Sequence, residues 1–144
     1  MNRRFSALLG LAVLLASCSS QDRGISDRIR TQIRASKTGP LDLGPVGPQG
    51  WERVCIFGPY STKKEVEQDL GFKWDFDSKS SASVDDGINL IVFVRGNEVL
   101  GHVDHPRRDG DFDSDKTPCT VRTRAVLPRG ARSDGVPLFT VPPR

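Results

Sequence analysis

The sequence predicts a small, single α+β domain in which a mostly antiparallel β-sheet packs against one short helix. Two stretches rich in β-branched and aromatic residues, 51–58 and 88–94, are typical of buried strands. Between them, residues 61–71 have the capping residues and apolar spacing of a helix. Gly96-Asn97, after the second stretch, is typical of a tight hairpin turn. Together with the strands described below, the expected order is β-α-β-β-β-β, with about five strands around one core.

The first strand and the helix have clear ends. Apolar side chains occupy both alternating positions of 51–58, which indicates a strand buried on two faces, and Pro59 ends it. The signals of the helix are the capping-box pair Thr62 and Glu65, the apolar pair Val66 and Leu70, and the terminal Gly71. We therefore expect a strand followed directly by a helix.

Four further segments are expected to complete the sheet. Residues 72–76 alternate aromatic with charged side chains and predict a half-exposed strand, whose aromatic residues are Phe72, Trp74 and Phe76. Residues 88–94 form a continuous apolar run suited to a central strand, which pairs through the hairpin with the segment that follows. Residues 119–127 alternate apolar residues with arginines and predict an amphipathic last strand.

The segments outside residues 51–128 have the composition of a linker and a tail. Residues 18–50 carry few large apolar side chains and end in TGPLDLGPVGPQG, so we expect a flexible Gly/Pro-rich tether with at most a short helix near Ser26. Residues 129–144 mix Pro, Gly and Arg and predict an irregular tail, with 136–141 as one candidate edge segment. The globular domain is then expected to span residues 51–128.

The first residues are typical of an export signal. MNRR precedes an apolar run that ends at Ala16 and is shorter than the roughly 20 residues that a membrane-spanning helix needs. At its end, Leu15-Ala16-Ser17-Cys18 resembles the lipobox of bacterial lipoproteins, which is an aliphatic residue, two small residues and a cysteine. The resemblance implies that residues 1–17 are removed and that Cys18 carries acyl chains such as palmitate. Because Ser19 rather than Asp follows the cysteine, the resemblance also favours the outer membrane as the location of the anchor.

Charge and cysteine count fit an exported protein. Arg3 and Arg4 leave with the leader, so 19 basic residues face 18 acidic ones in the mature chain, a formal balance of +1. That balance argues against a nucleic-acid partner, which requires a basic patch. With Cys18 lipidated, Cys55 and Cys119 are left to form one disulfide in an oxidising compartment, closing a loop of about 64 residues. Two buried free thiols are the alternative.

The densest polar segment is HVDHPRRDGDFDSD, residues 102–115, and it allows several chemistries. A calcium loop would use its alternating carboxylates, Asp109, Asp111, Asp113 and Asp115, although the EF-hand pattern fails because Lys116 and Arg122 stand where Gly and Glu are needed. A transition-metal site or a general base would use the cluster of His102, Asp104 and His105. On a strand, however, His102 and Asp104 share one face and His105 lies on the other.

No pattern in the sequence identifies a reaction. GxSxG, HExxH and P-loop motifs are absent from the sequence. We therefore expect a non-catalytic binding or accessory module without a cofactor, held in the membrane of a bacterial envelope by its N-terminal lipid and facing an envelope protein or surface ligand. The alternative is a small envelope hydrolase or metal-dependent enzyme that uses residues 102–115.

Overall fold

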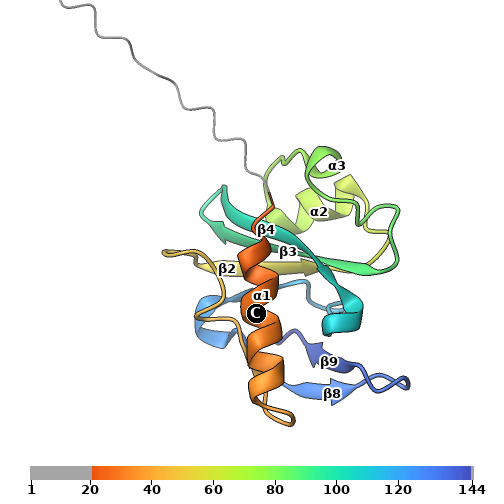
Figure 1. Cartoon of the computed structure of the whole chain (residues 1–144). Helices are drawn as coiled ribbons and strands as arrows, with labels where there is room; N and C mark the ends of the chain where they lie inside the picture. The colour runs from red at the N-terminus through yellow and green to blue at the C-terminus, as the bar shows by residue number, and fades with distance from the viewer. Residues whose placement is uncertain (1–20, 144) are drawn as a thin grey trace, which may run out of the picture.

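A four-stranded antiparallel sheet lies between helices in the computed structural model, which describes residues 21–143 (Figure 1). Its strands are, in spatial order, β4 (Glu98–Pro106), β3 (Ile88–Arg95), β2 (Arg53–Phe57) and β6 (Cys119–Val121). One face is covered by the long helix α1 (Arg23–Ala35), and the other by α2 (Lys63–Leu70) and the short α3 (Phe76–Lys79). The α+β class expected from the sequence is confirmed.

Two smaller sheets complete the described chain. β1 (Leu41–Asp42) pairs antiparallel with β7 (Val126–Leu127). β9 (Pro137–Thr140) lies between β5 (Asp111–Asp113), to which it is parallel, and β8 (Arg129–Ala131), to which it is antiparallel. Two single-turn 3₁₀ helices, η1 (Arg107–Asp109) and η2 (Arg122–Arg124), connect strands. Residues 21–143 thus form nine strands in three sheets, more than the five expected.

The central sheet is buried on both faces, as the apolar runs of 51–58 and 88–94 predict. Side chains of β2 and β3 alternate between two hydrophobic clusters. The α1 cluster contains Ile25, Ile29, Leu41, Leu43, Val46, Trp51, Val54, Ile56, Ile91, Phe93, Val103, Phe112, Ala125, Leu127, Phe139 and Val141. The α2 cluster contains Cys55, Phe57, Val66, Leu70, Phe76, Ala82, Leu90, Val92, Val94 and Cys119.

Three local predictions are confirmed. α2 begins with a complete capping box between Thr62 and Glu65 and ends at Gly71, which has the left-handed conformation that glycine adopts most easily. β3 and β4 form the hairpin around residues 96–97. Cys55 and Cys119 face each other in the register of β2 and β6 and are joined by a disulfide.

The expectation that residues 18–50 form a flexible tether is wrong for the part that the structure describes. α1 buries Ile25 and Ile29 completely, and the following Pro/Gly-rich segment adds buried residues to the α1 cluster. That segment packs so closely that a Cβ at Gly47 would lie 2.5 Å from the Phe93 ring. The glycines and prolines therefore permit close packing against the sheet rather than flexibility.

The expected irregular tail, residues 129–144, also proves to be folded as far as residue 143. β8 and β9 extend the structure beyond the expected boundary at residue 128, and Phe139 of β9 is buried in the α1 cluster. The globular unit therefore includes both segments that flank 51–128. Residues 1–17, Cys18 and the last residue lie outside the described part of the chain.

Two of the expected strands take other forms. Residues 72–76 do not pair with a strand: Phe76 begins α3 and is fully buried, while Glu67 accepts a hydrogen bond from the Trp74 backbone N–H at 3.0 Å. The aromatic side chains thus pack against the α2 cluster without a sheet. Residues 119–127 form two strands instead of one, because η2 breaks the segment and moves it from β2 to β1.

Candidate functional site

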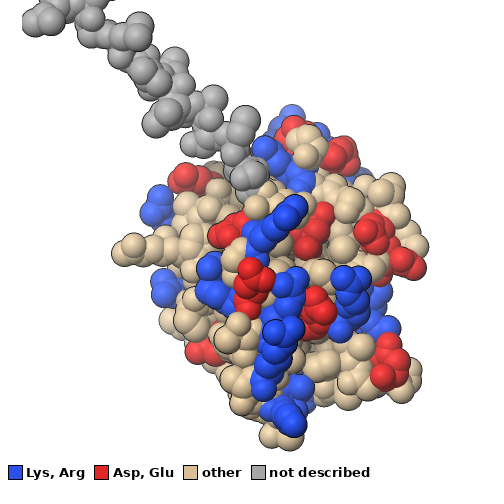
Figure 2. All heavy atoms as spheres, in the orientation of Figure 1, with Lys and Arg blue, Asp and Glu red and all other residues tan. Residues whose placement is uncertain are grey.

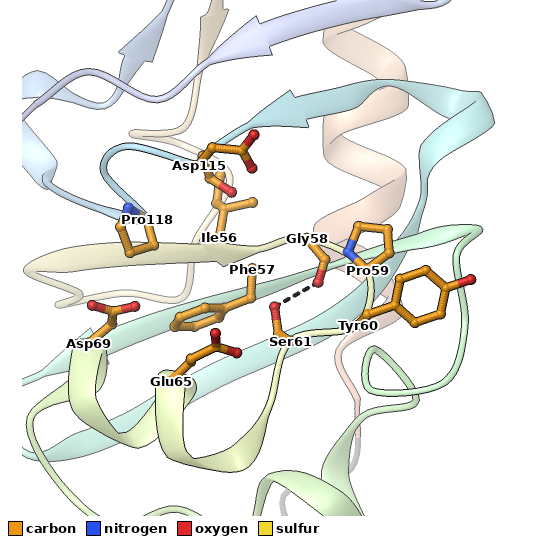
Figure 3. Close-up of a pocket in the computed structure, with 11 residues that line it drawn as sticks. Ile56, Phe57, Gly58, Pro59, Tyr60, Ser61, Glu65, Asp69, Asp115 and Pro118 are labelled. Atoms are coloured by element: carbon orange, nitrogen blue, oxygen red, sulfur yellow. Dashed lines mark hydrogen bonds between the residues drawn. The ribbon is translucent and has the colours of Figure 1, made fainter.

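A groove opens between the end of β2, the first turns of α2 and the loop that precedes β6 (Figure 3). It has a volume of about 280 Å³. Its floor includes the Phe57 ring, and its lining carries the carboxylates of Glu65, Asp69 and Asp115. Figure 3 shows Glu65 and Asp69 together on α2, with Asp115 across from them on the loop.

The order of residues between β2 and α2 explains how the groove forms. After β2 ends, the Ser61 hydroxyl donates a hydrogen bond to the Gly58 carbonyl at 2.7 Å, which closes a tight turn. Thr62 then caps α2. Glu65 and Asp69 are four residues apart and therefore lie on the same face of the helix, directed toward the groove.

Tyr60 stands at the rim of this groove in an unusual conformation. Its φ of 62° is the only positive value of a non-glycine residue in the described chain. Its backbone N–H donates to the Ala82 carbonyl at 2.6 Å, and its side chain is 63% exposed, directed away from the carboxylates. A left-handed conformation costs a non-glycine residue on the order of 1 kcal/mol, so this strained turn presents a large aromatic side chain to solvent.

The carboxylates give the groove an acidic lining. The backbone N–H and side-chain hydroxyl of Thr62 donate hydrogen bonds to Glu65, each at 2.8 Å, and hold the pKa of Glu65 below its ordinary value. Glu65 therefore keeps its negative charge at mildly acidic pH. The arrangement suits a ligand with cationic or hydrogen-bond-donating groups.

A second hollow, of about 350 Å³, lies on the other side of Gly58 and Pro59 and shares Asp115 with the groove. Its main charged group is Asp111, which is 3% exposed. Asp111 accepts hydrogen bonds from Arg107 at 2.8 and 2.9 Å, from Arg132 at 3.2 Å and from the Asn89 amide at 2.8 Å. Burial alone would raise the pKa of Asp111, but the hydrogen bonds from Arg107, Asn89 and the Phe112 backbone N–H outweigh it and lower the pKa.

The alternating carboxylates expected to form a calcium loop do not converge. Asp109 pairs with Arg30 at 2.8 Å, and Asp111 is enclosed by the donors described above. Asp113 is exposed at the end of β5, and Asp115 is exposed on the loop that follows. Within residues 21–143, no group of three or more His, Cys, Asp or Glu side chains is arranged to hold a metal ion.

His102 and His105 lie on opposite faces of β4, as the alternation of a strand requires. The His102 ring is 1% exposed and packs edge-on against Trp74 at 5.1 Å. Burial lowers the pKa of His102, although the nearby Asp104 carboxylate acts in the opposite direction. Asp104 itself accepts hydrogen bonds from the hydroxyl groups of Ser80 and Ser81.

His105 lies under α1. It is fully buried, and its Nδ1 lies 2.9 Å from the Ser26 hydroxyl. Burial lowers the pKa of His105 to about 4; Asp109 and Asp111 raise this pKa and Arg30 lowers it. The expected cluster of His102, Asp104 and His105 is therefore divided between two faces, where each side chain has a packing partner.

Sequence reasoning did not single out the groove. Glu65 was recognised as a capping residue, and Asp69 and Asp115 were not linked to it. The available signal was the segment GPYST between a strand and a helix, which places an aromatic residue in a tight turn. Folding was needed to bring the loop of Asp115 to the other side.

Comparisons with protein-family models, curated proteins and solved structures found no match to this chain. Among the helices of residues 21–143, none has the length and apolar character required to cross a membrane. The function is therefore inferred from the sequence and the structure of this chain.

Proposed function

We propose that this protein is a bacterial cell-envelope lipoprotein, held in a membrane by lipid on Cys18, whose folded domain is a non-catalytic binding or accessory module. Two of its three cysteines, Cys55 and Cys119, form the disulfide, so Cys18 is the remaining thiol. Disulfides of this kind form in exported proteins. Together with the lipobox resemblance of residues 15–18, this supports lipid attachment at Cys18, and Ser19 after the cysteine favours the outer membrane.

The observation that carries the binding role is Tyr60 at the rim of the acidic groove. Strained non-glycine conformations concentrate at functional sites, and exposed tyrosines contribute strongly to binding surfaces. Here a strained turn presents Tyr60 to solvent at the rim of the groove whose lining includes the carboxylates of Asp69 and Asp115. The groove is open to solvent and suits an envelope protein or surface ligand that offers basic groups.

A hydrolase or metal-dependent enzyme that uses residues 102–115 is the alternative, and it has less support. A general base must reach the proton that it removes. His102 and His105 are both buried, their rings lie on opposite sides of the sheet, and Asp104 is bound to serines. The exposed groove contains neither histidine.

The anchor is tested by the intact mass of the protein extracted from membranes, before and after reduction and alkylation. The expected species begins at Cys18, carries added acyl mass and takes up two alkyl groups only after reduction. Cys18→Ala should abolish both processing and acylation. A mature wild-type chain without lipid would overturn the anchor.

The binding role is tested with a photo-crosslinking amino acid placed at Tyr60 in intact cells. Val126, which is 49% exposed and is not part of the groove lining, is the matched control position. We expect a defined adduct from position 60, none from position 126, and a weaker adduct when Asp115→Asn is added. Equal labelling from both positions, or an adduct insensitive to Asp115, would contradict binding in the groove.

A further inference from the structure

The first described residues are fastened to the end of the domain that α2 and α3 occupy. Gln21 donates a side-chain hydrogen bond to the Lys79 carbonyl of α3 at 3.1 Å and accepts one from the Asp104 backbone N–H at 3.2 Å. The Asp22 backbone N–H donates to the His102 carbonyl at 2.8 Å. Figure 1 shows the described chain beginning beside α2 and α3, with α1 running away from them.

This attachment limits the distance between the domain and a lipid on Cys18. Cys18 precedes Gln21 by three residues, and three fully extended residues reach about 10 Å. A bilayer that holds the Cys18 lipid must therefore lie close to the surface around Gln21. This step rests on the lipid anchor of the proposed function.

The surface beside Gln21 has the chemistry of a membrane-contacting face. Two adjoining hollows, of about 630 and 350 Å³, share Lys63, Glu67 and Lys73, and their linings include the half-buried Phe72 and Trp74. Trp74 contacts His102, whose carbonyl binds Asp22, so this face lies next to the start of the described chain. Figure 2 shows basic side chains at this end of the molecule, with acidic ones among them.

Acidic as well as basic side chains lie on this surface, and the acidic Glu67 and Asp75 have local partners. Glu67 pairs with Lys63 at 3.9 Å, and the Asp75 carboxylate accepts a hydrogen bond from Ser78. Lys64 and Lys73 are exposed beside the aromatic residues. Lysines that flank tryptophan are typical of the headgroup region of a bilayer, where the ring enters the interface and the amines meet anionic lipids.

We infer that the α2–α3 face, defined as Lys63, Lys64, Phe72, Lys73, Trp74 and Lys79, docks on anionic phospholipid headgroups of the bilayer that holds the Cys18 lipid. The lipid anchor then fixes the orientation of the domain as well as its location. α1 points away from the membrane, and Arg34, eleven residues after Arg23, lies roughly 16 Å along the helix from its first residue. That distance exceeds the Debye length of about 8 Å at physiological salt.

The test uses tryptophan fluorescence of the full mature lipoprotein, with lipidation confirmed by mass, in vesicles of phosphatidylethanolamine and phosphatidylglycerol at roughly 3:1 that contain a headgroup spin-labelled lipid. The quencher reaches an interfacial Trp74 but not Trp51, which is 1% exposed in the α1 cluster. We expect quenching of the wild type and its loss in Trp74→Phe. Lys64→Gln/Lys73→Gln should also lose it, whereas the matched double variant Arg34→Gln/Lys37→Gln should keep it.

The possible outcomes separate the two proposals. Lipidated protein without Trp74 quenching, or with equal quenching in both double variants, overturns the docked orientation and leaves the anchor standing. Quenching that persists when phosphatidylglycerol is replaced by phosphatidylcholine overturns the role of anionic headgroups. A mass that shows no lipid on Cys18 overturns the anchor, and the docking inference falls with it.

Discussion

The two faces of the central sheet are covered in different ways. The α2 cluster draws all its residues from positions 55–119, within the segment in which sequence patterns locate helix, hairpin and disulfide. The α1 cluster adds residues from both ends of the described chain, such as Ile29 and Phe139. The face with strong local signals was therefore predictable, and the face assembled from distant segments was not.

Burial of a strand on two faces predicts a second covering layer, even where no local pattern identifies the segment that supplies it. Residues 54–57 and 90–94 are apolar at consecutive positions, and a strand of this kind needs a covering layer on each face. One short helix can supply only one layer. The second layer had to come from residues 21–50 or 129–143, even though their glycines and prolines are typical of linkers. The need to cover both faces of β2 and β3 thus outweighs the local composition of the flanking segments.

Removing the disulfide is the strongest way to test whether the two faces form one cooperative unit. We expect Cys55→Ala/Cys119→Ala to lower the free energy of unfolding by about 4 kcal/mol, because the bond closes a loop of 64 residues. Urea unfolding can be followed separately on each face in Trp51→Phe and Trp74→Phe variants. Both reporters should shift together. A shift confined to Trp74 would show that the α1 face folds independently.

Truncating a side chain of α1 tests the contribution of the segment that resembles a tether. Ile29→Ala should lower the free energy of unfolding by about 3 kcal/mol, because it leaves a cavity in the α1 cluster. Arg34→Ala on the exposed side of the same helix is the control and should change it by less than about 0.5 kcal/mol. If chemical denaturation showed equally small changes in the free energy of unfolding for both variants, α1 would contribute little to the stability of the fold.

His105, which is buried under α1, should make the stability of the protein depend on pH. Its pKa is about 4 in the folded protein and near the ordinary 6.5 in the unfolded chain, so the unfolded chain binds more protons between these values. Stability should therefore fall as the pH decreases, by about 2 kcal/mol between pH 7 and pH 5 from this residue.

The measurement for His105 is the free energy of unfolding at each pH for the wild type and for His105→Asn. The wild-type protein should lose more stability on acidification than the variant, with the difference developing below pH 6.5. His102 is present in both proteins, so its titration cancels in the comparison. Parallel pH profiles would refute a buried, neutral His105.

The smallest expected effect concerns the local cap of α2. Thr62→Ala removes the capping-box hydroxyl and should lower the free energy of unfolding by about 1 kcal/mol, as measured by urea denaturation. Thr31→Ala on the surface of α1 is the matched control, for which we expect a change within about 0.5 kcal/mol. If Thr31→Ala destabilised the protein more than Thr62→Ala, the local signals of α2 would not be the source of its stability.

Sequence patterns predict the features that neighbouring residues specify. The capping box of Thr62 and Glu65, the turn at Gly96 and the two-sided burial of β2 and β3 depend on residues a few positions apart. The cysteine count, taken with the lipobox resemblance, predicted the Cys55–Cys119 disulfide, and two free thiols were the alternative. The alternation of His102 and His105 across β4 also followed, since successive side chains of a strand point to opposite faces.

The positions of the two flanking segments and of the polar side chains depend on contacts between residues far apart in the sequence. The Ser26–His105 contact joins residues 79 positions apart, and the groove joins α2 to the loop of Asp115. No local pattern encodes such pairings, because they depend on which segments cover the sheet. Once α1 packs on the sheet, burial and hydrogen bonding assign His105 to the core, whereas Tyr60 and the carboxylates of the groove stay at the surface.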